Sequence, residues 1–272
     1  MPSFCEITKE QLSRIIGVPD PPNVVDVRNA QAERADPRLL PTARWLDVAD
    51  IGNWGPTFRG ARVVVYCGDG GSLSRGVAAW LRDDGANAET LMGGFAGWAE
   101  AKQPLVNPQP LPGRDARGRT VWVTRARPKI VRVACPWLIR RFIDPRARFL
   151  FVAPTEVEAV AKQFNATPFD AGHGIWNDRD EYCTFDVMLR EFGLQTEPLL
   201  RLAEIVRGAD TDGLDLAPQC AGLLAASLGF SRMYRDDSAQ IDAAMGVYDA
   251  FYRWCRDATG ETHNWPTGKA KP

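Results

Sequence analysis

A strand, a glycine-rich loop and a helix follow one another between residues 63 and 81, and this order limits the fold more than any other feature. Residues 63–66 are a continuous apolar run rich in β-branched side chains, which is typical of a strand buried on both faces. The loop 67–73 contains three glycines, and apolar residues of the segment 74–81 share one helical face, with Ser74 as the expected N-cap. Such a unit is typical of an α/β fold whose ligands bind at the carboxyl ends of parallel strands.

The sequence predicts two domains of different class, because 272 residues exceed the usual size of a single core. The runs 24–27 and 63–66 indicate an α/β domain with a parallel sheet and flanking helices. In the second half we expect strands at 131–133 and 149–152 around a helix at 136–143, within a mainly helical α+β domain. The expected boundaries are 1–106 for the first domain, 107–122 for a linker rich in proline and glycine, 123–260 for the second domain and 261–272 for a tail.

Cysteine is the residue type from which chemistry is expected. The six cysteines include no C-x-x-C pair and only two histidines are present, so we expect free thiols, no metal site and no cofactor. Cys67 lies between the strand and the glycine loop, where backbone N–H groups at a helix N-terminus can stabilise a thiolate or bind an anion. An inert core thiol is the alternative. The predicted nucleophile is therefore Cys67, and the predicted anion-binding loop comprises Gly68, Asp69, Gly70, Gly71, Ser72, Leu73 and Ser74.

Several segments of the first half resemble the rhodanese family. They are Val24–Arg28, Tyr66–Cys67 with its glycine loop, Ala78–Leu81, and Leu91–Trp98 followed by Pro104. The resemblance implies a rhodanese-like parallel sheet and sulfurtransferase chemistry. In that chemistry Cys67 would take a sulfane sulfur atom from a donor as a persulfide and pass it to a thiol acceptor. The resemblance also implies that Asp26 and Arg28 are structural.

The cysteine loop departs from the pattern of active sulfurtransferases in charge and in length. Asp69 stands where many of them carry an arginine, and its negative charge should repel anionic donors such as thiosulfate. With Ser74 aligned to the serine that starts the family's helix, the loop is one residue longer than usual and is similar to that of arsenate reductases and dual-specificity phosphatases. Phosphatase chemistry is not expected, since it needs the arginine that this loop lacks.

Basic residues are concentrated in the segment 114–148, which holds eleven arginines and lysines and only two acidic residues. This indicates either a local site for an anion or ion pairs with acids elsewhere in the fold. Cys135 precedes Pro136, a favoured first helical residue, so we expect its thiol at a helix N-terminus, either beside an anion or only as a cap. The predicted second-domain anion site comprises Arg132, Cys135, Arg140 and Arg141.

The second half resembles the C-terminal domain of chromate-resistance proteins of the ChrB type. The resemblance implies a role in chromate resistance or sensing and no defined catalytic residue. The better-known regulators of this family bind DNA, but the sequence shows no convincing helix-turn-helix, so DNA is not an expected partner. The segments that carry the resemblance are Lys129–Asp144, Cys183–Asp186, Ile205–Asp212, Leu216–Gln219, Gly222–Leu224 and Tyr248–Cys255.

Two further groups of polar residues are weaker candidates for a metal site. One combines His173 with Cys183 and Asp186, and the other is formed by aspartates at 210, 212 and 215. Capping of turns and helix starts accounts for these acids more simply.

The two resemblances predict a rhodanese-type sulfurtransferase that forms a Cys67 persulfide, coupled to a chromate-resistance domain in the response to oxyanion stress. The alternative is a non-enzymatic chromate- or oxyanion-sensing protein with a degenerate rhodanese module, which Asp69 would favour. Expected partners are a sulfane-sulfur donor, a thiol acceptor, and chromate or another oxyanion. Since neither a secretory signal nor a membrane-spanning apolar run is found, we expect the chain in the cytoplasm and not at a membrane.

Overall fold

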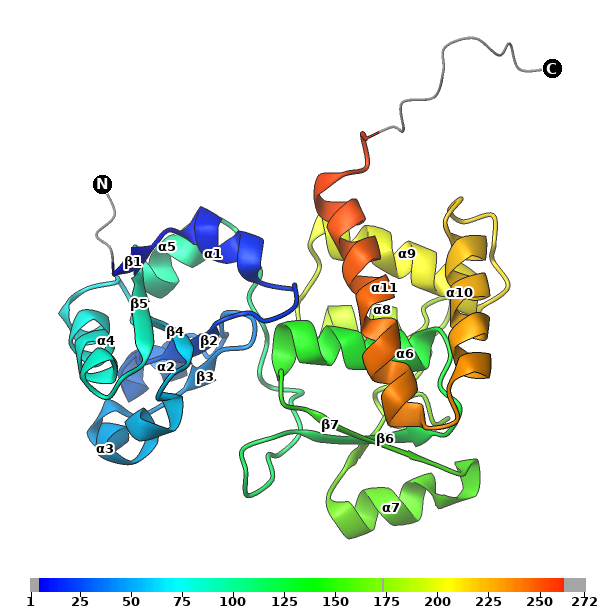
Figure 1. The fold of residues 1–272 in the computed structure, drawn as a ribbon, viewed down its shortest axis with the longest axis horizontal. Coiled ribbons are helices and arrows are strands. Elements are labelled where there is room, and N and C mark those ends of the chain that lie inside the picture. Colours follow the sequence, from blue (N-terminus) through cyan, green and yellow to red (C-terminus); the bar gives the residue numbers. More distant parts are fainter. Residues whose placement is uncertain (1–4, 173, 262–272) are drawn as a thin grey trace.

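The first half of the chain folds around a five-stranded parallel sheet in the computed structural model, which describes residues 5–172 and 174–261 (Figure 1). The strands are β1 (Glu6–Ile7), β2 (Asn23–Asp26), β3 (Arg44–Trp45), β4 (Arg62–Tyr66) and β5 (Asn87–Leu91), in the order β1-β5-β4-β2-β3. The helices are α1 (Lys9–Ile15), α2 (Ala30–Ala35), α3 (Ile51–Trp54), α4 (Ser72–Asp83) and α5 (Gly94–Glu100).

Alternate residues of β4 enter two different cores, because successive side chains of a strand point to opposite faces of the sheet. Val63 and Val65 pack with apolar residues of α3 and α4. Val64 and Tyr66 face the other core, which contains residues of α1 and α5. Helices therefore cover both faces of the sheet, as the α/β class requires, and this part of the fold prediction is confirmed.

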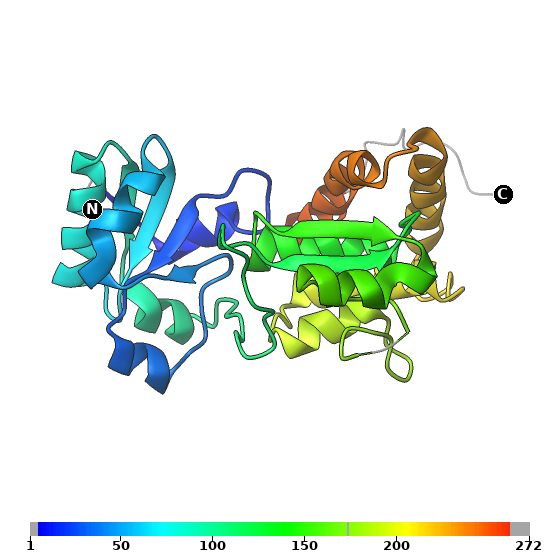
Figure 2. The same cartoon turned by 90° about the horizontal axis from the view of Figure 1, so that it is seen from below.

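The second half contains a three-stranded parallel sheet and a layer of helices (Figure 2). Val121 and Val123 pack toward α7 on one face, whereas Trp122 enters the main core beneath the remaining helices. The mainly helical α+β class is thereby confirmed. The elements are β6 (Val121–Arg125), β7 (Arg148–Val152) and β8 (Thr167–Pro168), in the order β7-β6-β8, with α6 (Val131–Leu138), a π-helical turn (Ile139–Ile143), α7 (Val157–Phe164), α8 (Thr184–Glu191), α9 (Glu197–Asp210), α10 (Cys220–Met233) and α11 (Asp237–Asp257).

The two halves share one hydrophobic core instead of being joined only by a linker. Residues of α1 and α5 belong to the same buried cluster as residues of α6, α9 and α11. Gly17, with φ of +72°, brings the backbone after α1 against second-half rings: an added Cβ atom would lie 2.5 Å from Phe142 and 2.8 Å from Tyr252. The connecting segment is anchored as well, since the N–H of Asn107 donates to the carbonyl of Phe192 at 2.8 Å.

The structure corrects the secondary structure expected around α6. Residues 131–133 form the first turn of this helix and are not a strand, and the helix begins at Val131 and not at Pro136. The strand at 149–152 is confirmed as part of β7, whereas β6, its partner in the sheet, was not expected. Among the described helices, none is both long and apolar enough to cross a bilayer.

Candidate functional site

Cys67 follows β4, the central strand of the first sheet, directly at its carboxyl end. The residue is 4% exposed and packs in the core between the sheet and α4. Its Sγ atom lies 3.2 Å from Oγ of Ser74 and 3.4 Å from Oδ1 of Asp69. The thiol is thus held between the sheet and the start of a helix, where a nucleophile is expected in this class of fold.

The helix after the loop starts earlier than expected, so the prediction of Ser74 as its N-cap is wrong. Helix α4 begins at Ser72, and Gly71 occupies the N-cap position. Ser74 is fully buried, and its hydroxyl donates to the carbonyl of Gly71 at 3.1 Å while it contacts Cys67 Sγ. The serine therefore orients the thiol, and the first N–H groups of α4 lie just beyond it without intrahelical acceptors.

A second glycine-rich loop supports the cysteine loop from the carboxyl end of β5. An added Cβ atom on Gly94 would lie 2.4 Å from the nitrogen of Gly70 and 2.5 Å from the carbonyl oxygen of Cys67. The N–H groups of Phe95 and Ala96 donate to the carbonyls of Cys67 and Gly68, both at 2.9 Å. The close approach explains physically why this part of the rhodanese-like sequence pattern consists of glycines.

The carboxylate of Asp69 occupies one backbone donor of the cysteine loop. It accepts a hydrogen bond from the N–H of Gly71 at 2.9 Å and another from the Cys67 thiol. The Gly71 N–H, followed by the Cys67 thiol, lowers the pKa of Asp69 from its ordinary value. Asp69 therefore stays ionised and competes with any anion for this loop.

Two exposed apolar side chains stand at the rim of the loop, beside the exposed Asp69 and Ser72. Leu73, at the start of α4, is 39% exposed, and Met92, in the supporting loop, is 42% exposed. Ser72, next to Leu73, is exposed, whereas Gly70 of the same loop is buried. The predicted loop residues thus lie together around Cys67, and its role as a nucleophile stays a prediction.

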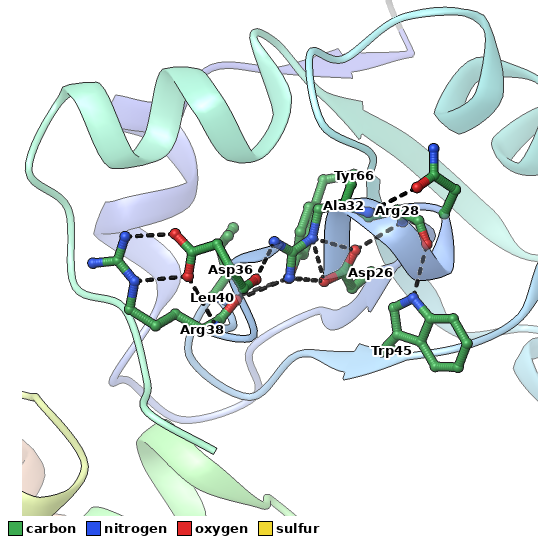
Figure 3. A network of polar contacts seen from close by, with 9 residues as sticks. Asp26, Arg28, Ala32, Asp36, Arg38, Leu40, Trp45 and Tyr66 are labelled. Carbon is green, nitrogen blue, oxygen red and sulfur yellow. Dashed lines mark hydrogen bonds and ion pairs between the residues drawn. The ribbon is translucent and has the colours of Figure 1, made fainter. Parts of the chain in front are cut away.

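Asp26 and Arg28 form a buried network behind the loop (Figure 3). The guanidinium group of Arg28 lies 2.6 Å from the carboxylate of Asp26 and also donates to two backbone carbonyls, those of Asp36 and Arg38. The hydroxyl of Tyr66, the residue before Cys67, donates to Asp26 at 3.0 Å. The network fixes the end of β4, which agrees with a structural role for the pair.

Cys135 does not lie at a helix N-terminus, so that expectation is wrong. It is the fifth residue of α6 and is fully buried. Burial, followed by the charges of neighbouring groups, first of all Cys183, raises its pKa well above the ordinary value. The helix starts at Val131 because distant groups hold the residue before it: Ile130 donates to Ser227 Oγ at 2.9 Å and accepts from the Tyr248 hydroxyl at 2.8 Å.

The three arginines expected around Cys135 pair with three different carboxylates. Arg132 lies 3.1 Å from Asp170, Arg140 lies 2.7 Å from Asp242, and Arg141 lies 2.7 Å from Asp249. The structure does not bring them together with Cys135 into one site. For these arginines it supports the alternative reading of the basic segment as a source of ion pairs.

Buried acids lie near the start of α6, and the sequence indicated only some of them. Burial, followed by the charge of Asp170, raises the pKa of Asp210 to about 6. Cys183 contacts Asp186 at 3.2 Å, and burial raises the pKa of Asp186. Within the described part of the chain no three histidine, cysteine or acidic side chains are grouped as a metal ion requires. His173 and His263 lie outside the described residues.

Both halves of the chain match known families. Residues 8–101 match the rhodanese-like domain family, and residues 122–255 match the C-terminal domain of the ChrB family. The protein ChrB of Cupriavidus metallidurans is 34% identical over 146 residues, which are 52% of this chain and 43% of that protein. This chain therefore matches less than half the length of that relative.

Three solved structures are similar to part of this chain. The rhodanese-related protein of Thermoplasma volcanium is 21% identical, with 38% of this chain and 98% of that chain covered and a TM-score of 0.33. The rhodanese-like domain protein of Staphylococcus aureus is 23% identical, with 35% and 91% covered and a TM-score of 0.32. The thiosulfate sulfurtransferase of Pseudomonas aeruginosa is 24% identical, with 38% and 19% covered and a TM-score of 0.33. The family matches confirm both resemblances seen in the sequence: residues 8–101 match the rhodanese-like domain, and residues 122–255 match the ChrB C-terminal domain.

Proposed function

We propose that Cys67 accepts a sulfane sulfur atom as a persulfide and passes it to a thiol acceptor. The observation that carries the proposal is the position of its Sγ atom, 3.2 Å from the buried Ser74 hydroxyl and beside the first turn of α4. When the thiol ionises, the Ser74 hydroxyl turns from the Gly71 carbonyl to donate to the sulfur. This donor and the first helical N–H groups, which have no intrahelical acceptors, stabilise a thiolate and, after transfer, the terminal sulfur of a persulfide.

The reaction consists of two displacements at sulfur. The Cys67 thiolate attacks the outer sulfur of the donor, the donor's bond to that sulfur breaks, and the remainder leaves with the electron pair as a thiolate or as sulfite. An acceptor thiolate then attacks the outer sulfur of the persulfide, which restores the Cys67 thiolate. The exposed apolar side chains of Leu73 and Met92 favour an acceptor with an apolar surface.

Within the cell, we propose that this chemistry serves the response to oxyanion stress, because the domain that follows is of the ChrB type. A second candidate function is a non-enzymatic oxyanion-sensing protein, in which the rhodanese unit is a degenerate binding module and transfers no sulfur. Asp69 favours this candidate, since its carboxylate already accepts from the Gly71 N–H and repels thiosulfate.

Mass spectrometry of the intact protein distinguishes the two candidates. The purified chain is exposed separately to thiosulfate and to glutathione persulfide, and a gain of about 32 Da, one sulfur atom, is sought. We expect the gain with glutathione persulfide, its loss in Cys67→Ser, and its retention in Cys5→Ser, which serves as the control. The absence of an adduct with both donors would eliminate the enzyme and leave the binding module.

A further inference from the structure

A cavity of about 510 Å³ lies between the two halves of the molecule. It is lined on one side by Asn23, which opens β2, and by Ala61, which directly precedes β4. The segment 143–146 of the second half lines the other side. Cys67 follows the carboxyl end of β4, so the cavity and the thiol lie at opposite ends of the same strand.

Two arginines of this cavity have no carboxylate partner among the residues that the structure describes. Arg44 opens β3 and Arg146 precedes β7, so they come from different halves. Both arginines also line a second pocket, of about 440 Å³, which Gly118 lines as well. Their guanidinium groups converge at this glycine, where an added Cβ atom would lie 3.1 Å from Nη2 of Arg44 and 3.4 Å from Nη2 of Arg146. Burial, followed by the charges of Arg146 and Arg114, lowers the pKa of Arg44 from its ordinary value. An anion between these groups would relieve their repulsion.

A third arginine adds to the positive charge of the cavity. Arg114 donates to the carbonyl of Gly118 at 2.9 Å and lies 3.2 Å from Asp144. Asp144 is 2% exposed and already accepts hydrogen bonds from the N–H and the hydroxyl of Thr120, at 2.7 and 2.9 Å. Four arginines and two aspartates, Asp20 and Asp144, line the cavity, so its net charge is positive and suits an anion.

The cavity wall also contains a hydroxyl group without a hydrogen bond. Thr42 is 7% exposed, and its Oγ1 atom is buried with no partner in the described part of the chain. Its φ of +64° is unfavourable for a β-branched residue, and its N–H donates to the carbonyl of Phe142 at 2.8 Å. Buried polar groups in native proteins nearly always have partners. Rotation of the side chain would turn this hydroxyl, which is closed to solvent in the structure, toward a ligand in the cavity.

We propose that this cavity binds a doubly charged oxyanion group through Arg44, Arg146 and Arg114, with the Thr42 hydroxyl as a further donor. Guanidinium groups bind the oxygens of such anions through paired N–H donors. The cavity has room for more than a single inorganic ion. The group can therefore be free sulfate or phosphate, or the phosphate of a small organic molecule. Since Thr42 and Arg44 belong to the first half and the other two to the second, the ligand bridges both halves.

Titration calorimetry of the full chain with sodium sulfate, sodium phosphate and glycerol phosphate, at matched low ionic strength, tests the site. Arg44→Gln and Arg146→Gln should each weaken binding about tenfold or more, because each removes a charge-assisted hydrogen bond. Arg253→Gln is the matched control, since Arg253 is an exposed arginine paired with Asp257 on α11, and it should bind as the wild type does. Cys67→Ser should also bind normally, which separates this site from the proposed sulfur transfer.

Thr42→Val tests the site independently, because valine keeps the shape and removes only the hydroxyl. The ligand-free variant should unfold at the same or a higher temperature than the wild type, while its affinity for the anion falls. Tighter binding of glycerol phosphate than of both ions would identify an organic ligand, and equal or weaker binding a free ion. The proposal is overturned if none of the three anions binds the wild type, or if Arg44→Gln and Arg146→Gln bind them as tightly as the wild type.

Discussion

Cys67 and Cys135 both stand before an expected helix, yet the fold gives them opposite environments. Cys67 precedes the start of α4 and contacts a hydroxyl and a carboxylate. Cys135 lies inside α6, fully buried, with its pKa well above the ordinary value because of burial. The difference shows that the position at which the helix starts decides whether a cysteine becomes a candidate nucleophile. Residues close in sequence set the start of α4, whereas residues distant in sequence set the start of α6.

Alkylation of the native protein should separate the two thiols by the largest factor. We expect iodoacetamide to modify Cys67 at least about a thousandfold faster than Cys135, because Cys135 must be exposed by unfolding before it can react. Peptide mass mapping after timed exposure measures both rates, and urea-unfolded protein, in which the rates should be similar, is the control. Comparable rates in the native protein would show that the two thiols do not have different environments.

Rigid support of the cysteine loop can be tested at Gly94. Gly94→Ala should lower the free energy of unfolding by about 2–3 kcal/mol, because the new methyl group would clash with the backbone of Gly70 and Cys67. Gly97→Ala, three residues further on in α5, is the control, since an added Cβ atom there would lie 3.8 Å from the carbonyl oxygen of Met92, an ordinary contact distance. Urea unfolding measures both variants. Equal stability of the two would mean that the loops are not tightly packed.

The surroundings of Cys135 should make stability depend on pH through Asp210. Its folded-state pKa of about 6 lies above the unfolded value, so the wild type loses stability as pH rises through the interval from about 4 to 6. Asp210→Asn removes this loss. The free energy of unfolding of the variant relative to that of the wild type should therefore rise by about 1–3 kcal/mol between pH 4 and pH 7. Urea unfolding across this range tests the prediction. A constant stability difference would show that Asp210 does not titrate with a raised pKa.

The smallest expected effect concerns the charge beside Cys67. Asp69→Asn should raise the alkylation rate of Cys67 at fixed pH about fivefold, because Asp69 Oδ1 lies 3.4 Å from the sulfur and a charge so close disfavours the thiolate by about 1 kcal/mol even at the dielectric constant of water. Asp83→Asn, at the far end of α4, removes the same charge from an exposed position and should have little effect. An unchanged rate in Asp69→Asn would mean that this carboxylate does not govern the thiol.

The first half was largely predictable because its signals are local. The apolar run of β4, the three loop glycines and the helical face after them are neighbours in sequence, and the structure keeps their order. The N-cap of α4 lies three residues before the expected one, because Ser74 resembles an N-cap. Its hydroxyl instead bonds the carbonyl of Gly71 and contacts Cys67, a choice that depends on the folded loop.

The second half was less predictable because its decisive contacts are distant in sequence. Pro136 predicts a helix start. However, Ser227 and Tyr248, on α10 and α11, hold Ile130 and fix the first residue of the helix before Pro136. The arginine cavity was missed for the same reason. Arg146 was visible as part of a basic segment, whereas its counterpart Arg44 lies in the other half and becomes its neighbour only after folding.

The contact of Gly17 with Phe142 and Tyr252 makes the junction between the halves a packed interface and not a hinge. A glycine at this point lets two aromatic rings seat directly on backbone, and the buried cluster then continues across the boundary. A swing of one half against the other would separate the Gly17 backbone from both rings and open this cluster, so the two halves should move as one rigid body.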